Sequence, residues 1–137
     1  MTELELAWAA GIFDGEGYVC LKELRPNVFQ LEVGVGNTDM RLIGRFKGWF
    51  GGHTHIRLAE EQGSLSRKPI AYWRVTSRAA GEFLQIVRPY SVVKAEQIDL
   101  ALATRVLMSK PGVPNPNVEE LRRIRHQLST IKKRGRS

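Results

Sequence analysis

The sequence has few of the features that mark a secreted or membrane protein. It has a single cysteine, Cys20, which excludes an internal disulfide framework and fits a reducing compartment. No apolar run approaches the roughly 18–20 residues that a membrane span requires, so we expect no membrane-spanning segment. Glu3 and Glu5 precede any apolar stretch, whereas a secretion signal begins with basic residues. We therefore expect a protein without a secretion signal.

Basic residues are missing from the first twenty positions, although the chain as a whole is basic. Residues 1–20 hold four acids, Glu3, Glu5, Asp14 and Glu16, and no lysine or arginine. The remainder carries +11, because the whole chain carries +7. Such an excess favours nucleic acid, an anionic membrane or another acidic partner. A small acidic region in a basic protein fits a metal-dependent enzyme acting on polyphosphate, and an acidic N-terminal helix without that role is the simpler alternative.

The length and the apolar content, 137 residues and 42%, are ordinary for one globular domain. Periodicity and turn residues predict a helix over 3–16, strands over 18–24 and 28–36, a helix from Thr38 or Asp39 to Gly51, strands over 53–58 and 70–76, a helix from Ser77 to Arg88, and a helix over 92–108. We therefore predict an α+β fold in which four strands form one antiparallel sheet with helices on one face and the other face open.

The C-terminal part is predicted to be a Pro-rich turn over 109–117 followed by a basic helix over 118–133. Asn117 is the expected N-cap of that helix, and Glu119 and Glu120 suit its first turn. Residues 119–137 contain seven lysines and arginines against two acids, which favours contact with phosphate over a merely solvated face.

The first predicted helix contains residues that weaken it. Ala7, Gly11 and Gly15 lie four apart on one stripe, and a glycine costs about 1 kcal/mol relative to alanine inside a helix. Small residues on one stripe allow another element to pack at backbone distance. That element is either the protein's own sheet or a second copy of the same helix.

Asp14 and Glu16 lie at the C-terminal end of this helix, where the helix dipole disfavours carboxylates by about 0.3–1 kcal/mol each. Next to Gly17, Glu16 would have main-chain carbonyl oxygens nearby, and oxygen atoms are the ligands of hard divalent cations. If the small stripe pairs two copies of the helix, two Glu16 side chains approach each other. Bound metal ions would relieve their repulsion and would flank a scissile phosphate.

Residues 9–17, AAGIFDGEG, resemble the nine-residue signature of the LAGLIDADG homing endonucleases. The first position is alanine instead of leucine, and the eighth is glutamate instead of aspartate. The resemblance implies that Glu16 is the catalytic, metal-binding acid, that Gly15 contributes beside it, and that Mg²⁺ is the cofactor. It also implies a helix interface formed by Ala7, Gly11 and Gly15, with Asp14 as a more structural acid at its end.

The resemblance extends over most of residues 5–108, because the order of elements matches the family's αββαββα core, whose saddle-shaped sheet lies in the major groove of DNA. It implies further catalytic residues at Asn37, Arg41 and Lys94. We assign residues 1–108 to the endonuclease core and 109–137 to a turn and helix of the same domain. Only one signature is present, which implies a homodimer acting on a palindromic or pseudo-palindromic target.

Alternation places Lys22 on the sheet face that, by this resemblance, meets double-stranded DNA. Glutamine pairs with adenine and glutamate accepts from cytosine, so Gln30 and Glu32 are expected base readers, while turns and the last helix supply phosphate contacts. The full predicted DNA-binding set is Lys22, Arg25, Asn27, Gln30, Glu32, His55, Arg57, Arg67, Lys68, Arg74, Arg122, Arg125, Lys132 and Lys133. For each of these, an ordinary solvated surface position is the alternative. Trp8, Trp49 and Trp73 are expected in the core.

The sequence thus predicts a site-specific DNA endonuclease that makes a metal-dependent double-strand break. Residue 1 is not a splicing nucleophile and the chain lacks a His-Asn end, so an intron-encoded or free-standing enzyme is favoured over an intein. Such a protein is expected to be cytoplasmic in a prokaryote or phage, or organelle-encoded. Two alternatives with the same fold stay open: a non-cleaving DNA-binding regulator, and an RNA maturase whose partner is the intron RNA.

Overall fold

The computed structural model describes residues 1–58, 68–108, 110 and 113–134, without the side chains of Lys133 and Arg134. The elements are α1 (Glu3–Glu16), β1 (Gly17–Arg25), β2 (Val28–Asn37), α2 (Met40–Phe50), β3 (His53–Arg57), β4 (Ile70–Thr76), α3 (Ser77–Val87), the 3-10 turn η2 (Arg88–Tyr90), α4 (Ala95–Arg105) and α5 (Val118–Arg134). Arg67 lies outside the described residues, so its predicted DNA contact stays a prediction.

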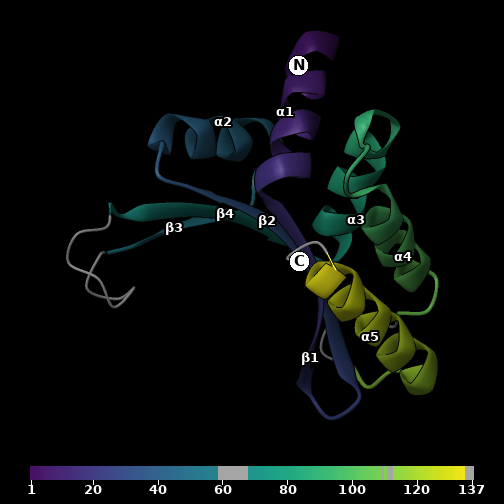
Figure 1. Ribbon diagram of the computed structural model, residues 1–137. Helices are drawn as coiled ribbons and strands as arrows, with labels where there is room; N and C mark the ends of the chain where they lie inside the picture. The colour runs from purple at the N-terminus through teal and green to yellow at the C-terminus, as the bar shows by residue number, and fades with distance from the viewer. Residues whose placement is uncertain (59–67, 109, 111–112, 135–137) are drawn as a thin grey trace.

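The four strands form one antiparallel sheet in the order β1-β2-β4-β3. Figure 1 shows α1, α2 and α3 on one side of this sheet, with α4 and α5 beside the hairpin of β1 and β2. The sheet bends, so that the β1–β2 hairpin and the β3–β4 hairpin point in different directions. The predicted α+β class and the open sheet face are confirmed.

Alternation along the strands separates the two faces of the sheet. On β4, Ala71, Trp73 and Val75 are buried beneath the helices, while the residues between them point to the other face. Cross-strand pairing places Tyr18, Gly34, Arg74 and His53 in one row of that open face. The face that contains Lys22 is therefore the open one, as the sequence predicts.

Aromatic rings fill the core between the sheet and the helices. Trp73 is fully buried, its Nε1 donates to the Gly51 carbonyl at 2.7 Å, and its ring lies 5.0 Å from those of Phe46 and Phe83. The prediction that Trp8 belongs to the core is wrong in part. One side of Trp8 packs edge-on against Trp49, but 41% of the residue is exposed.

Two predicted helix starts are also wrong. Ser77 does not act as an N-cap, because it has φ of +54° and Thr76 occupies the cap position without a side-chain cap bond. The helix expected from residue 92 begins at Ala95, since the residues before it form a turn. Asn117 directly precedes α5, where the sequence predicts its N-cap, and its carbonyl accepts from the Leu121 N–H at 3.0 Å, while its side-chain amide nitrogen donates to the Leu107 carbonyl at 3.0 Å.

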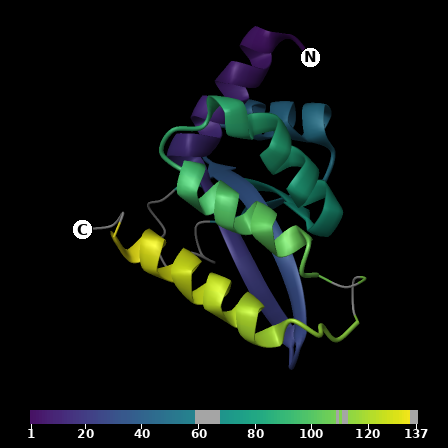
Figure 2. The same ribbon diagram turned by 90° about the vertical axis from the view of Figure 1, so that its right-hand side faces the viewer.

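Helix α5 packs onto the same core as the rest of the chain, alongside α4 and the β1–β2 hairpin (Figure 2). Leu121, Ile124 and Leu128 are its buried stripe. Arg122 donates to Glu23 of β1 at 2.8 Å, and this hydrogen bond lowers the pKa of Glu23 to about 2. Among the described residues, no helix combines the length and apolar character needed to cross a bilayer.

Candidate nuclease site and nucleic-acid interface

Helix α1 delivers Glu16 to the edge of the sheet with no loop between helix and strand. The helix begins with a capping box in which the Thr2 hydroxyl and the Glu5 carboxylate each accept the other residue's backbone N–H. It ends at Glu16, and β1 starts at the next residue, Gly17. A Cβ at Gly17 would lie only 2.6 Å from the Phe13 carbonyl oxygen, so the direct passage from helix to strand requires glycine.

Glu16 and Asn37 line one open hollow, as the sequence predicts for two residues of one site. The hollow has a volume of about 410 Å³, and the side chains of Tyr18 and Tyr72 form its walls. The Oδ1 atom of Asn37 accepts from the Asp39 N–H at 2.8 Å. That bond orients the Asn37 amide, whose NH₂ group is then the donor that this residue can offer to a ligand.

Arg41 does not line this hollow. Its Nε and Nη2 donate to the two carboxylate oxygens of Asp39 at 3.1 and 2.9 Å, on the exposed first turn of α2. The hydrogen bond from Arg41 lowers the pKa of Asp39 to about 2, so the pair is charged at neutral pH. The predicted catalytic role of Arg41 stays a prediction that requires the side chain to leave Asp39.

Asp14 holds the turn that precedes α4. Its carboxylate accepts the backbone N–H groups of Val92, Val93 and Lys94 at 2.8, 3.3 and 3.2 Å. The Lys94 ammonium in turn donates to the Asp14 main-chain carbonyl at 2.8 Å. Asp14 therefore connects α1 to the turn before α4 within one chain, and its predicted place at the helix interface stays a prediction.

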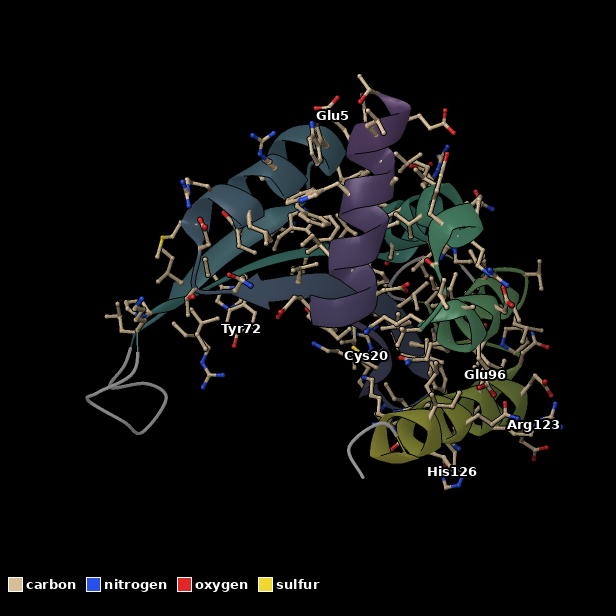
Figure 3. All side chains as sticks on the ribbon, turned by 45° about the horizontal axis from the view of Figure 1, so that its top comes forward. Glu5, Cys20, Tyr72, Glu96, Arg123 and His126 are labelled. Atoms are coloured by element: carbon tan, nitrogen blue, oxygen red, sulfur yellow. The ribbon has the colours of Figure 1, made fainter. Side chains whose placement is uncertain are left out.

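Lys94 is largely enclosed, and its predicted catalytic role stays a prediction. Only 9% of it is exposed, and burial lowers its pKa. It lines a hollow with Gly15, Gly17 and Lys132, and Tyr18 borders both this hollow and the one that contains Asn37. Cys20, whose thiol pKa is raised by burial, lies between this end of α1 and α5 (Figure 3).

Removing the Asp14 carboxylate should destabilise the protein. We expect the Asp14→Ala variant to lose about 1–2 kcal/mol of unfolding free energy in urea, because three backbone donors lose a charged acceptor. Asp99→Ala is the matched control, since Asp99 is an exposed acid paired with Arg88 alone, and we expect little change from it. Equal stabilities of the two variants would contradict the assigned role of Asp14.

The small stripe of α1 is open in this chain, which excludes one of the two alternatives left by the sequence; pairing with a second copy stays a prediction. Ala9, Ala10 and Phe13 are the buried residues of this helix and face the core. Gly11 and Gly15 are exposed, and an added Cβ at either would meet no atom within 4 Å. The stripe does not pack against the protein's own sheet.

The open face of the sheet is cationic, but Glu32 does not take the exposed position expected of a base reader. It is 4% exposed and accepts hydrogen bonds from Tyr18, Lys22 and Arg74. Burial opposes its ionisation, yet these hydrogen bonds outweigh burial and hold the pKa of Glu32 below its usual value. A ligand on this face would therefore contact the half-exposed side chains of Lys22 and Arg74 and not Glu32 itself.

The other residues predicted to bind DNA occupy three places. Gln30, His55, Arg57 and Arg74 share the open face with Lys22, and the His55 ring stacks on Tyr72 with centroids 4.9 Å apart. Asn27, in the left-handed region with φ of +68°, forms the β1–β2 turn beside Arg25, and Lys68 is exposed at the start of β4. On α5, Arg125 is exposed and Lys132 half-buried, whereas Arg122 is bound to Glu23 and Asn27; the Lys133 side chain lies outside the described part.

The solved structures that resemble this chain share one architecture. The homing endonuclease I-CvuI, in complex with its target in the presence of Ca, matches with a TM-score of 0.73 and 15% identity, over 93% of this chain and 82% of that one. An archaeal intron-encoded homing endonuclease, I-Vdi141I in complex with DNA, matches with a TM-score of 0.71 and 12% identity, over 94% and 84%. This chain has the LAGLIDADG homing-endonuclease fold. No family model matches the sequence, and no curated protein matches it significantly.

Within the homing-endonuclease fold, sequence reasoning missed two site residues, Tyr18 and Tyr72. Both line the hollow with Glu16, and the Tyr18 hydroxyl also donates to Glu32 at 2.7 Å. Tyr72 is labelled in Figure 3 on the side of the sheet away from α2. Their positions on the same alternating face as Lys22 and Arg74 were the available signal.

The residues at the end of α1 fit a hard cation only in part. Glu16 is exposed and supplies a carboxylate, and the last turn of the helix supplies main-chain carbonyl oxygens. Within the described residues of one chain, no three His, Cys, Asp or Glu side chains lie close enough together to hold a metal ion. The donor set is therefore of the right chemistry, and further oxygen ligands would have to come from outside the described residues of this chain.

Proposed function

We propose that this protein is a site-specific endonuclease that binds double-stranded DNA on its open sheet face and cuts both strands with the help of Mg²⁺. The observation that carries the proposal is the placement of Glu16, an exposed acid, in one hollow with Asn37 beside a cationic sheet. A carboxylate there would repel phosphate unless a cation lay between them. One similar I-CvuI structure holds its target DNA in the presence of Ca, and another holds a DNA target in the presence of Mg without cleavage; both support DNA and a divalent cation as partners of this chain.

The second carboxylate of the site would come from a second copy of the chain. Gly11 and Gly15 leave the stripe of α1 open at backbone distance, so two α1 helices can pack closely and bring two Glu16 residues together. Leu4, which is 84% exposed, and the exposed side of Trp8 would also be covered in such a dimer. A two-fold dimer presents the same surface to each half-site, so the target is palindromic or nearly so.

Each chain would contribute metal ligands, a residue that orients the attacking water and a residue that positions the end of α1. Glu16, with the Gly15 carbonyl, would hold Mg²⁺, which when bound supplies charge stabilisation at the phosphate and an activated water. Asn37 would orient the attacking water through its amide, which the Asp39 N–H already positions. Lys94 would act as a positioning residue, because its ammonium holds the Asp14 carbonyl at the end of the helix that carries Glu16.

A non-cleaving DNA-binding regulator would need the basic sheet face but would not need an exposed acid beside it. Glu16 works against phosphate binding in the absence of metal, so its presence in the hollow favours a nuclease. The similar archaeal enzyme is intron-encoded, and we propose an intron-encoded or free-standing gene for this chain as well.

The proposal is tested with DNA duplexes selected by the protein from a randomised palindromic library. We expect the selected duplex to be cut in both strands in Mg²⁺ and to be bound but uncut when the metal is chelated, as measured on denaturing gels. Specific binding without cutting in either Mg²⁺ or Mn²⁺ would instead establish a binding-only regulator. Preferential binding and folding of a structured intron RNA, without a selected duplex, would favour the maturase alternative.

A further inference from the structure

The open face of the sheet contains one buried acid held between two cations. Glu32 lies on β2, one of the two inner strands, and its side chain is 6% exposed. Its Oε1 accepts from Lys22 Nζ at 3.0 Å and from Arg74 Nη1 at 3.2 Å, while its Oε2 accepts from the Tyr18 hydroxyl at 2.7 Å. We call these four residues, Tyr18, Lys22, Glu32 and Arg74, the Glu32 cluster.

The two cations of the Glu32 cluster come from different strands and remain half-exposed. The Lys22 side chain, on β1, is 46% exposed, and the Arg74 side chain, on β4, is 43% exposed. Both line a hollow of about 530 Å³ that Thr54 also borders. Each cation gives Glu32 one hydrogen bond, and both side chains line that hollow, so the guanidinium and the ammonium retain N–H groups that a ligand there can accept from.

We propose that Glu32 is a positioning residue for base recognition, which sets Lys22 and Arg74 side by side as a reader of guanine in each half-site. The proposal rests on the proposed function, since it specifies the sequence that the DNA-binding face selects. Lysine and arginine donate to O6 and N7 of guanine in the major groove. A cation whose conformation is already fixed by a carboxylate loses less freedom when it binds a base.

The charge balance of the Glu32 cluster fits this role better than it fits a purely structural one. The two cations and one acid leave one positive charge facing the hollow. A buried ion pair adds little to stability, because desolvation offsets the attraction between the charges. The Glu32 side chain is 6% exposed and already accepts from three donors, so little of its carboxylate is accessible to cytosine, the base that the sequence alone predicts it to read.

The experiment compares the base preferences of variants at the same positions of the half-site. Wild type, Lys22→Ala, Arg74→Ala and Glu32→Gln are each used to select duplexes from a randomised palindromic library in Ca²⁺, and enrichment is read by sequencing. We expect wild type to select G·C at one or two positions and each cation variant to weaken that preference by about tenfold. Glu32→Gln should weaken it roughly 3- to 10-fold at the same positions, since the cations remain but are less restricted.

Gln30→Ala is the matched control, because Gln30 is on the same face and is the Cα partner of Lys22. It should change preference at a different position and leave the G·C positions intact. If Glu32 reads cytosine directly, Glu32→Gln will abolish the G·C preference while Lys22→Ala and Arg74→Ala retain it, which overturns the proposal. An unchanged G·C preference in folded Glu32→Gln also overturns it.

Folding is followed by thermal unfolding of each variant, because a structural role alone would change the midpoint and not the base preference. If Glu32→Gln does not fold, Tyr18→Phe replaces it; this variant removes the hydrogen bond to Glu32 at 2.7 Å and keeps all three charges. It should relax the same G·C positions by about two- to threefold, and no relaxation there overturns the proposal. Failure of DNA binding in the proposed function looks different, since wild type would then select no sequence at all. Failure of cleavage alone would leave this selection unchanged, because the selection reads binding in Ca²⁺.

Discussion

The Glu16→Gln protein is expected to bind its DNA target and to cut it at least roughly 10²–10³-fold more slowly than wild type. Glutamine keeps the shape of the side chain, so the hollow with Asn37 should remain as it is. It removes the negative charge that would hold Mg²⁺, and with it the activated water. Single-turnover cleavage of a labelled duplex in Mg²⁺ measures the rate, and gel mobility shift measures binding.

Binding and cleavage should respond in opposite directions to this change. Without metal, two Glu16 carboxylates face the phosphates, so Glu16→Gln should bind DNA more tightly than wild type when the metal is chelated. Glu3→Gln is the matched control, because it makes the same change at the other end of α1, where Glu3 accepts from Tyr90. If Glu16→Gln cut DNA at the wild-type rate, or if Glu3→Gln lost as much cleavage activity as Glu16→Gln, the assigned role of Glu16 would be contradicted.

The Gly11→Arg protein is expected to fold more stably as a monomer and to dimerise at least about 100-fold more weakly than wild type. An added side chain at Gly11 meets no atom of its own chain within 4 Å, and arginine favours a helix over glycine by about 0.5–1 kcal/mol. In a dimer packed through this stripe, the same side chain would place an unpaired charge between two helices. Sedimentation equilibrium gives the dissociation constant, and urea unfolding of the monomer gives the stability.

Gly44→Arg provides the matched control for that experiment. Gly44 is also an exposed helical glycine, in α2, and a Cβ there also meets no atom within 4 Å. This variant should gain similar stability and keep the dimer and double-strand cleavage. A Gly11→Arg protein that remained a tight dimer and cut both strands normally would show that α1 is not the interface.

Local patterns in the sequence were enough to predict most of the helices and strands. The residue spacing in α1, the alternation of β4 and the Gly51-Gly52 stop after α2 all depend on neighbours close in the chain, so the positions of these elements could be predicted. Both glycines have positive φ, which the sequence signals directly. The start of α4 could not be predicted, because the Asp14 carboxylate from the first helix holds the turn before it.

Some features of the candidate site likewise follow from local sequence patterns, and others depend on tertiary contacts. The sequence alone determined that Glu16 ends a helix, that Lys22 and Arg74 share a sheet face, and that the small stripe runs along α1, since each follows from a local period. Only the tertiary structure decided that the stripe is open, that Arg41 pairs with Asp39, and that Glu32 is buried between two cations. These depend on hydrogen bonds and packing between strands and helices, whose partners no local pattern specifies.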